Sequence, residues 1–148
     1  MKKFLEEWRK FLVEETEYEG ILKLSPDERD LVELEVLQAM LPEDAIRLVP
    51  EDLHVTLVHQ SILKPFEDKL KSLDFPPAPA LSLDDQVFLR QSPGKKSWAV
   101  RLANQDEMRD YVKYIMELLG SQNTNPEPER VFHISLANLT GNPGDSVR

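Results

Sequence analysis

The chain has 148 residues, of which 41% are hydrophobic and 30% are charged, as expected for one soluble domain and not for a disordered chain. It contains no cysteine, which excludes disulfides, thiolate metal sites and a cysteine nucleophile. The net charge is −9, which disfavours binding of long nucleic acid because that binding depends on cations that pair with phosphates. No apolar run reaches the roughly eighteen residues of a membrane span, and no apolar secretory signal is found at the N-terminus. We therefore expect a cytoplasmic protein that does not bind membranes.

The first third of the chain predicts two helices and a short strand. An apolar stripe at helical spacing predicts a helix over residues 4–15, and residues 21–24 predict a strand. The sequence SPDE then predicts a helix start, in which Ser25 caps and Glu28 completes a capping box. This helix is expected to end before Pro42. Its predicted apolar face comprises Leu31, Leu34, Val36, Leu37 and Leu41.

The middle of the chain predicts three strands and one short helix. Residues 53–58 (LHVTLV) form the first predicted strand, and residues 65–73 form the helix. The proline-rich segment that follows predicts a stiff extended connector. Two further strands, over 83–89 and 97–102, flank the turn sequence SPGK, so we expect them to pair as a hairpin.

The last third predicts a capped helix, a polar loop and a strand. Asn104 and Glu107 match a second capping box, and Gly120 is expected to end the helix that it opens. Residues 121–130 predict a polar loop and residues 131–136 (VFHISL) a strand. The predicted apolar face of the helix comprises Met108, Val112, Ile115, Met116 and Leu119.

Two stretches of the chain share one plan: a short strand, a capped helix, a connector and a strand that contains a histidine. Ser25 precedes His54 by 29 residues, and Asn104 precedes His133 by the same number. We interpret this as a duplicated β-α-β unit. The predicted fold is α+β, two-lobed and pseudo-symmetric, with antiparallel sheets around a central groove that the two histidine strands face. Equal spacing by coincidence is the alternative, because helices of this length between strands are common.

The two histidine strands each carry a hydroxyl side chain beside the imidazole. Alternate side chains of a strand share a face, so His54 projects with Thr56, and His133 with Ser135. The apolar residues between them face the core. This arrangement suits phosphodiester chemistry, because one neutral imidazole can accept a proton from an attacking hydroxyl while an imidazolium protonates the leaving oxygen. The hydroxyls can donate hydrogen bonds to the phosphate oxygens. The alternative is a pair of structural strand histidines without a catalytic role.

Other chemistries find less support in the sequence. His54 and His59 lie five residues apart and are expected on opposite faces of one strand, and no carboxylate stands at a spacing that would complete a metal site. We therefore expect no metal and no cofactor, and interpret His59 as a strand-end residue or as one that supports the site without contacting the substrate. Neither the Gly-x-Ser-x-Gly motif of serine hydrolases nor a glycine-rich phosphate loop is present.

The motifs HVTL at 54–57 and HISL at 133–136 resemble the paired H-x-[T/S] motifs of the 2H phosphoesterase superfamily, which includes LigT-like RNA-end phosphodiesterases. The resemblance covers most of the chain. The segments YEGILKLSPDE and HISLANLTGNPGDSV look more narrowly like the phage anti-CBASS phosphodiesterases, which degrade cyclic nucleotide signals of bacterial defence. One departure is that the sequence stops fifteen residues after His133, which implies a short or trimmed C-terminal lid.

The resemblance implies a metal-independent phosphodiesterase that cleaves the 3′–5′ linkages of cyclic di- and trinucleotides such as 3′,3′-cyclic GMP-AMP. A ribose 2′-hydroxyl would attack the adjacent phosphorus, and this attack would form a 2′,3′-cyclic phosphate. Its catalytic residues would be His54, Thr56, His133 and Ser135. Tyr18, and after it Trp98, would stack on the bases. Weaker candidates for phosphate or base contacts are Lys23, Arg101 and Asn138.

The implied protein is a monomer in the cytoplasm of an infected bacterial host, with a small cyclic oligonucleotide as its partner. Two alternatives stay open. One is an RNA-end enzyme that opens 2′,3′-cyclic phosphates, although the acidic net charge counts against a track for RNA. The other is a non-catalytic module that sequesters a cyclic nucleotide, which would need the groove but not both histidines.

Overall fold

The structure is a computed structural model that describes residues 15–147, without the side chains of Glu15 and Asp85. The helix expected over 4–15 lies outside these residues except at Glu15, which instead begins a strand. Among the described residues, no helix is long and apolar enough to cross a membrane.

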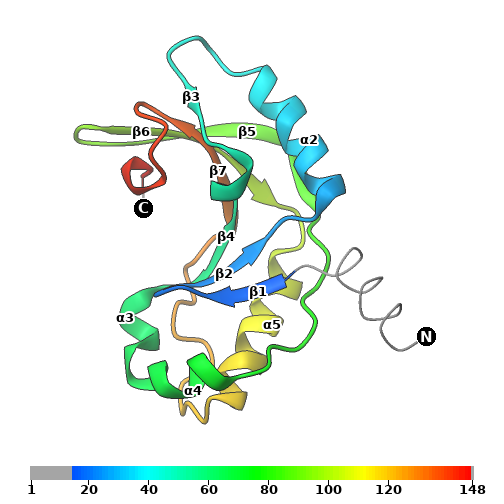
Figure 1. Cartoon of the computed structure of the whole chain (residues 1–148), viewed down its shortest axis with the longest axis vertical. Coiled ribbons are helices and arrows are strands. Elements are labelled where there is room, and N and C mark those ends of the chain that lie inside the picture. The colour runs from blue at the N-terminus through cyan, green and yellow to red at the C-terminus, as the bar shows by residue number, and fades with distance from the viewer. Residues whose placement is uncertain (1–14, 148) are drawn as a thin grey trace.

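The described residues form an α+β fold around one antiparallel sheet of seven strands (Figure 1). The short strand β3 (Ile46–Arg47) also pairs with β7 but lies outside the main strand order. The other strands, in spatial order, are β1 (Glu15–Tyr18), β2 (Leu22–Ser25), β4 (Val55–Val58), β7 (His133–Asn138), β6 (Lys95–Leu102) and β5 (Leu83–Ser92).

The two histidine strands are neighbours in this sheet. Separate sheets that face each other across a groove were expected, but β4 and β7 pair directly, with Val55 opposite Ile134. The pairing joins β1-β2-β4 to β7-β6-β5 in one sheet. It also removes two open strand edges, whose unpaired backbone groups would otherwise need water or another chain.

Helices cover the sheet at both of its ends (Figure 1). Helix α2 packs against β7, and α5 packs against β4. Gln38 of α2 reinforces the first contact, because its Nε2 donates to the backbone oxygen of Leu136 at 2.9 Å. The helices are α2 (Glu28–Ala39), α3 (Gln60–Leu63), α4 (Glu67–Ser72) and α5 (Gln105–Leu118), with short 3₁₀ turns at Pro50–Asp52, Lys64–Phe66 and Pro143–Asp145.

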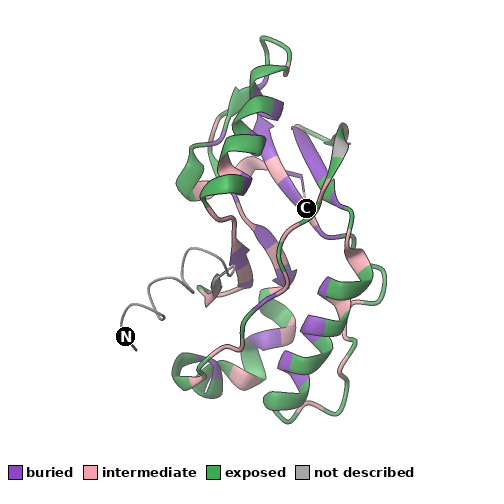
Figure 2. Cartoon of the chain, turned by 90° about the vertical axis from the view of Figure 1, so that its right-hand side faces the viewer, coloured by how far each residue is buried: buried purple, intermediate pink, exposed green. Residues whose placement is uncertain are grey.

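The core lies between the helices and one face of the two central strands. Figure 2 shows buried residues along the inner strands and on the helix faces turned toward them. On α5 the predicted apolar positions are all buried, as the helical periodicity indicated. Around the two motifs, buried residues of the central strands alternate with the half-buried Thr56, His133 and Ser135; the buried residues are Val55, Leu57, Ile134 and Leu136. This alternation confirms which face of each motif points to the core. Farther along the two strands, Val58, Ala137 and Asn138 are fully buried as well.

The helix caps differ from those predicted. Asp27, and not Ser25, caps α2: its Oδ1 accepts from the backbone N–H of Asp30 at 2.8 Å, and the Asp30 side chain accepts from the backbone N–H of Asp27. Ser25 cannot cap because it is the last residue of β2. Val36, expected on the apolar face, is 58% exposed.

Asn104 stands at the start of α5 but makes no cap hydrogen bond with its side chain. Instead its Nδ2 donates to Glu107 at 2.8 Å and to the backbone oxygen of Ala80 at 2.9 Å. Its Oδ1 accepts from the backbone N–H of Ser82. The side-chain amide of Asn104 therefore links the proline-rich connector to the start of α5. The prediction of a second capping box was wrong.

Candidate active site

The register of the central strands brings the four predicted catalytic side chains together. Because Val55 and its partner on β7 point into the core, the side chains that flank them point to the opposite face. The antiparallel register places Thr56 beside His133 and His54 beside Ser135. The two histidines thus lie on a diagonal of the register, for which neighbouring residues are about 7–8 Å apart and their Cβ atoms somewhat closer.

Both imidazoles are oriented in the same way. Nδ1 of His54 bonds to the backbone oxygen of Asp52 at 2.8 Å, and Nδ1 of His133 bonds to the backbone oxygen of Val131 at 3.0 Å. Since a carbonyl oxygen only accepts hydrogen bonds, each Nδ1 must carry a proton. In the neutral ring the lone pair is therefore on Nε2, the nitrogen that could exchange a proton with a ligand.

The four side chains line one cavity of about 720 Å³, a size typical of small-molecule sites. Three arginines from different segments line it with them: Arg90 on β5, Arg101 on β6 and Arg130 in the loop before β7. Glu127 and Glu129 lie on the same loop. The cavity thus gathers cations although the chain as a whole is acidic, which suits a small anionic ligand.

The surroundings of His133 favour its neutral form. Burial lowers its pKa from the usual value, and electrostatic interaction with Arg90, Arg130 and His54 lowers the pKa further, against the opposing effect of the bond to Val131. Arg90 also donates from Nη1 to Nε2 of His133 at 2.8 Å. Phe88 contacts the imidazole edge to face, with ring centroids 6.2 Å apart. A neutral, oriented imidazole of this kind can act as a general base.

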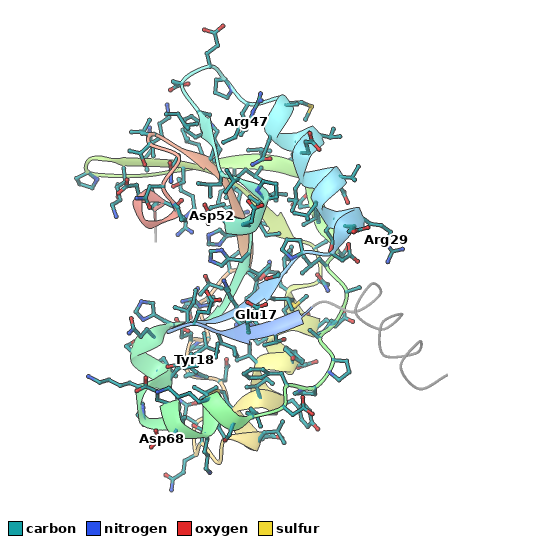
Figure 3. The ribbon with its side chains drawn as sticks, viewed as in Figure 1. Glu17, Tyr18, Arg29, Arg47, Asp52 and Asp68 are labelled. Carbon is teal, nitrogen blue, oxygen red and sulfur yellow. The ribbon has the colours of Figure 1, made fainter. Side chains whose placement is uncertain are left out.

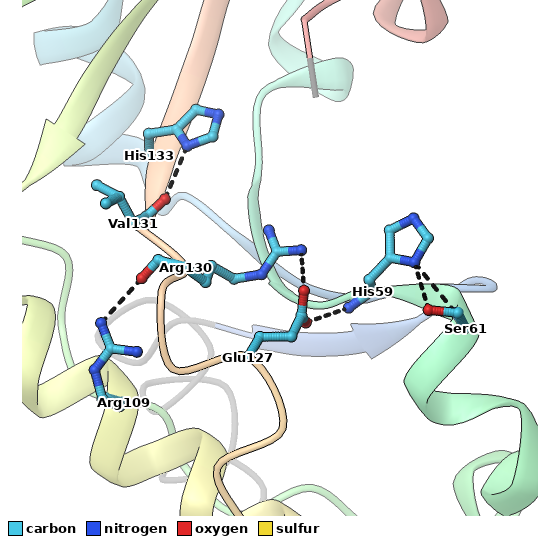
Figure 4. A network of polar contacts seen from close by, with 7 residues as sticks. All are labelled: His59, Ser61, Arg109, Glu127, Arg130, Val131 and His133. Atoms are coloured by element: carbon cyan, nitrogen blue, oxygen red, sulfur yellow. Dashed lines mark hydrogen bonds and ion pairs between the residues drawn. The ribbon is translucent and has the colours of Figure 1, made fainter.

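A network of polar contacts fixes the loop that forms the rim of the cavity (Figure 4). Glu127 accepts from Arg130 at 2.6 Å and from the backbone N–H of His59 at 2.9 Å. Burial opposes ionisation of Glu127, but these two hydrogen bonds outweigh it and hold the pKa of the carboxyl below its usual value. Arg109 of α5 donates to the backbone oxygen of Arg130 at 2.9 Å. The loop at 121–130 is therefore anchored to α5 and to the end of β4.

His59 lies on the same cavity as His54, although the sequence placed the two on opposite faces. The reason is that β4 ends at Val58 and the chain turns directly into α3, where His59 is the N-cap. Its Nδ1 accepts from the backbone N–H of Ser61 at 3.2 Å. Among residues 15–147, no group of three or more histidine, aspartate or glutamate side chains could hold a metal ion.

The structure places neither Tyr18 nor Trp98 in the cavity. Tyr18 lies on the edge strand β1, half-buried against the core (Figure 3). Trp98 is only 6% exposed and packs against Ala45 and Ala137. An irregularity in the pairing of β6 with β7 falls directly after Trp98. The aromatic side chain that does line the cavity is Phe88.

The three weaker candidates have different environments. Arg101 lines the cavity, with its guanidinium 4.5 Å from the centre of the Phe88 ring. Lys23 pairs with Glu19 at 2.8 Å. Asn138 is fully buried and holds the chain that follows β7, because its Nδ2 donates to the backbone oxygen of Asn142 at 2.6 Å. Of the three, only Arg101 is placed to contact a ligand in the cavity.

Sequence reasoning missed Arg90, Arg130 and Phe88. No motif marks them, and their place in the cavity depends on strand order and on the path of the loop. Searches of protein-family models, of curated proteins and of solved structures find no match to this chain.

Proposed function

We propose that the protein is a phosphodiesterase of the 2H type, which opens a 3′–5′ linkage of a small cyclic oligonucleotide by acid–base catalysis with two histidines. The observation that carries the proposal is the diagonal of His54 and His133 on paired strands, each ring fixed through Nδ1 and lining the same cationic cavity. A structural pair of histidines would have no need of this matched orientation toward one cavity.

The arrangement of elements supports a duplicated architecture for this fold. Strand β2, helix α2 and strand β4 form one unit, and β6, α5 and β7 form the other. In the sheet they lie as β2-β4-β7-β6, which is the order that a twofold axis between the histidine strands would give. Each helix packs on the histidine strand of the other unit. We infer that the equal spacing in the sequence reflects this symmetry.

In the proposed reaction, neutral His133 is the general base. Its Nε2 takes the proton of a ribose 2′-hydroxyl, and the resulting oxyanion attacks the adjacent phosphorus. The P–O bond to the neighbouring 5′ oxygen breaks, and protonated His54 gives its Nε2 proton to that oxygen. The products are a 2′,3′-cyclic phosphate end and a free 5′-hydroxyl. Thr56 and Ser135 donate hydrogen bonds to the non-bridging oxygens as their charge grows.

A small cyclic substrate fits the charge distribution better than a long RNA does. The arginines that line the cavity are gathered around the two histidines, while the chain carries 27 acidic and 18 basic residues. Binding of long RNA depends on neutralising successive phosphates along the backbone. A cyclic di- or trinucleotide places all its phosphates within one cavity.

Cleavage assays in the presence of EDTA test the proposal. One substrate is 3′,3′-cyclic GMP-AMP and the other is an RNA that ends in a 2′,3′-cyclic phosphate. We expect turnover of the first, with His54→Ala and His133→Ala each losing about 10²–10⁴-fold in rate. His59→Ala is the matched control, because His59 lines the same cavity outside the pair, and we expect it to retain most of the activity.

Other outcomes would favour other functions. Turnover of the RNA alone would indicate an RNA-end enzyme. Retention of the cyclic dinucleotide without cleavage would indicate a sequestering protein. Near wild-type rates in both histidine variants would contradict the assigned roles.

A further inference from the structure

We propose that Arg90 masks the general base in the free protein and that the phosphodiester of the substrate draws Arg90 away from it. Arg90 is then a phosphate-binding residue of the reactive subsite, and the base becomes available only when a phosphate is bound. This inference rests on the proposed function, because it assigns His133 the role of the base.

The neutral imidazole of His133 has a single lone pair that can accept a proton. Its Nδ1 carries a proton that is donated to Val131 at 3.0 Å, so the neutral ring has one lone pair, on Nε2. Arg90 donates to that nitrogen at 2.8 Å. The guanidinium stays protonated at all ordinary pH values and can only donate. While this bond lasts, Nε2 cannot accept a proton from a ribose hydroxyl.

A guanidinium binds a phosphodiester more strongly than it binds a neutral imidazole. A bond from arginine to a neutral imidazole involves one charged partner, whereas a bond to a phosphodiester joins opposite charges and can be bidentate. Arg90 lines the same cavity as the imidazole that it contacts. A phosphodiester bound between the two histidines would therefore compete directly for the guanidinium and win.

Arg90 differs from the other two arginines of the cavity in the group that its guanidinium contacts. Arg130 is paired with Glu127 at 2.6 Å, and Arg101 lies over the ring of Phe88. Arg90 instead contacts the catalytic imidazole. It starts from β5 opposite Ser97 and reaches His133 across β6.

Chemical modification of the whole chain measures whether Arg90 blocks His133, and it does not require that the protein cleaves a substrate. Diethyl pyrocarbonate acylates an unprotonated imidazole nitrogen, so mass spectrometry of the peptide that holds His133 measures access to its Nε2. We expect His133 to be acylated severalfold faster in Arg90→Gln than in the wild type. Lys96→Gln is the matched control and should leave the rate unchanged, because Lys96 pairs with Asp44 at 3.3 Å and does not line the cavity.

A second measurement tests the displacement by phosphate. The probe is 3′,3′-cyclic GMP-AMP with both 2′-hydroxyls replaced by hydrogen, which lacks the attacking oxygen. In a ¹⁵N NMR spectrum of the histidine side chains, we expect saturation with this probe to shift the Nε2 signal of His133 in the wild type away from its Arg90-bonded position. In Arg90→Gln the signal should start at a different position.

The kinetic effect separates this role from a purely structural one. The groups that face His133 are Arg90 from β5, Arg101 opposite it on β6, Arg130 from the loop and His54 from the residue before β4. Loss of the Arg90 charge should raise the pH of the acidic limb of kcat/KM. Loss of its bond to phosphate should lower kcat/KM by about 10²-fold. Arg90→Lys keeps the charge, and should leave the acidic limb in place.

These measurements distinguish failure of the inference from failure of the proposed function. If the cyclic dinucleotide is cleaved and the histidine variants are inactive, but acylation of His133 is equal in the wild type and Arg90→Gln, the masking role is wrong and the function stands. If neither substrate is cleaved or bound, the proposed function is wrong, and with it the role of Arg90 on a substrate phosphate. Faster acylation in Arg90→Gln together with a shifted acidic limb supports the inference.

Discussion

If His133 is the base of the proposed reaction, the environment of His133 determines how that reaction depends on pH. An unperturbed histidine has a pKa of about 6.5, and burial together with the nearby positive charges lowers the pKa of His133 below that value. Since His133 must be neutral to act as the base, kcat/KM should stay high as the pH falls to about 6.5. Below the pKa of His133 it should fall about tenfold per pH unit. Initial rates at low substrate concentration, measured from pH 4.5 to 9 with cyclic GMP-AMP, report this acidic limb for the free enzyme.

The same pKa determines how stability depends on pH. Because the pKa of His133 is lower in the folded chain than in the unfolded chain, the unfolded chain binds more protons between those two values. The free energy of unfolding should therefore fall as the pH drops below about 6.5, and the fall should be smaller in His133→Gln. Urea unfolding at several pH values measures both. An acidic limb of kcat/KM at or above about pH 6.5, with equal pH dependence of stability in both proteins, would refute this reasoning.

Three further predictions concern the stability of the fold, measured by urea or thermal unfolding. Asp27→Ala should cost about 0.5–2 kcal/mol because it removes the cap of α2, whereas Ser25→Ala should cost less, since Ser25 is not the cap; equal losses would contradict the assignment. Leu136→Ala should cost about 2–5 kcal/mol because Leu136 is fully buried, and Val36→Ala, at an exposed position, should change stability little. Gly141→Ala should cost about 1–2 kcal/mol, because Gly141 has a φ of +79° and an added Cβ would meet the side chain of a neighbouring residue at 2.8 Å; a neutral effect would count against this turn.

The sequence was most informative where side-chain periodicity was strong. The helical stripe from Met108 to Leu119 and the alternation around His54 and His133 each predicted which face is buried, and the structure confirms both. Such patterns are reliable because the burial of apolar surface dominates the stability of a fold. The site followed from the same alternation, since polar side chains between buried ones must face away from the core.

Features that depend on a choice between local alternatives were not predictable. Ser25 and Asp27 are both good capping residues two positions apart, and the strand that ends at Ser25 decides between them. The motif itself has the same ambiguity: His59 is also followed by a serine at the second position, Ser61. What distinguishes His59 is that it caps the start of a helix, whereas His54 directly precedes β4 and His133 begins β7.

The surroundings of the two histidines depend on long-range pairing. Arg90 reaches His133 only because β5, β6 and β7 are neighbours in that order. Phe88 lines the cavity, whereas Trp98, expected to stack on a base, is buried on another cluster. Local sequence predicts neither of these placements, because strand order and irregularities of register are properties of the assembled sheet.

The central claim is that His54 and His133 act on the same phosphorus atom, and a double-mutant cycle on the rate of cyclic GMP-AMP cleavage tests it most directly. If the two imidazoles serve one chemical step, the loss of either disables that step, and effects of residues that act as a unit are not additive. We predict that His54→Ala/His133→Ala cleaves the substrate no more slowly than the less active single variant. A double variant in which the two losses multiply, to about 10⁴-fold or more where each single change costs about 10²-fold, would contradict a shared site.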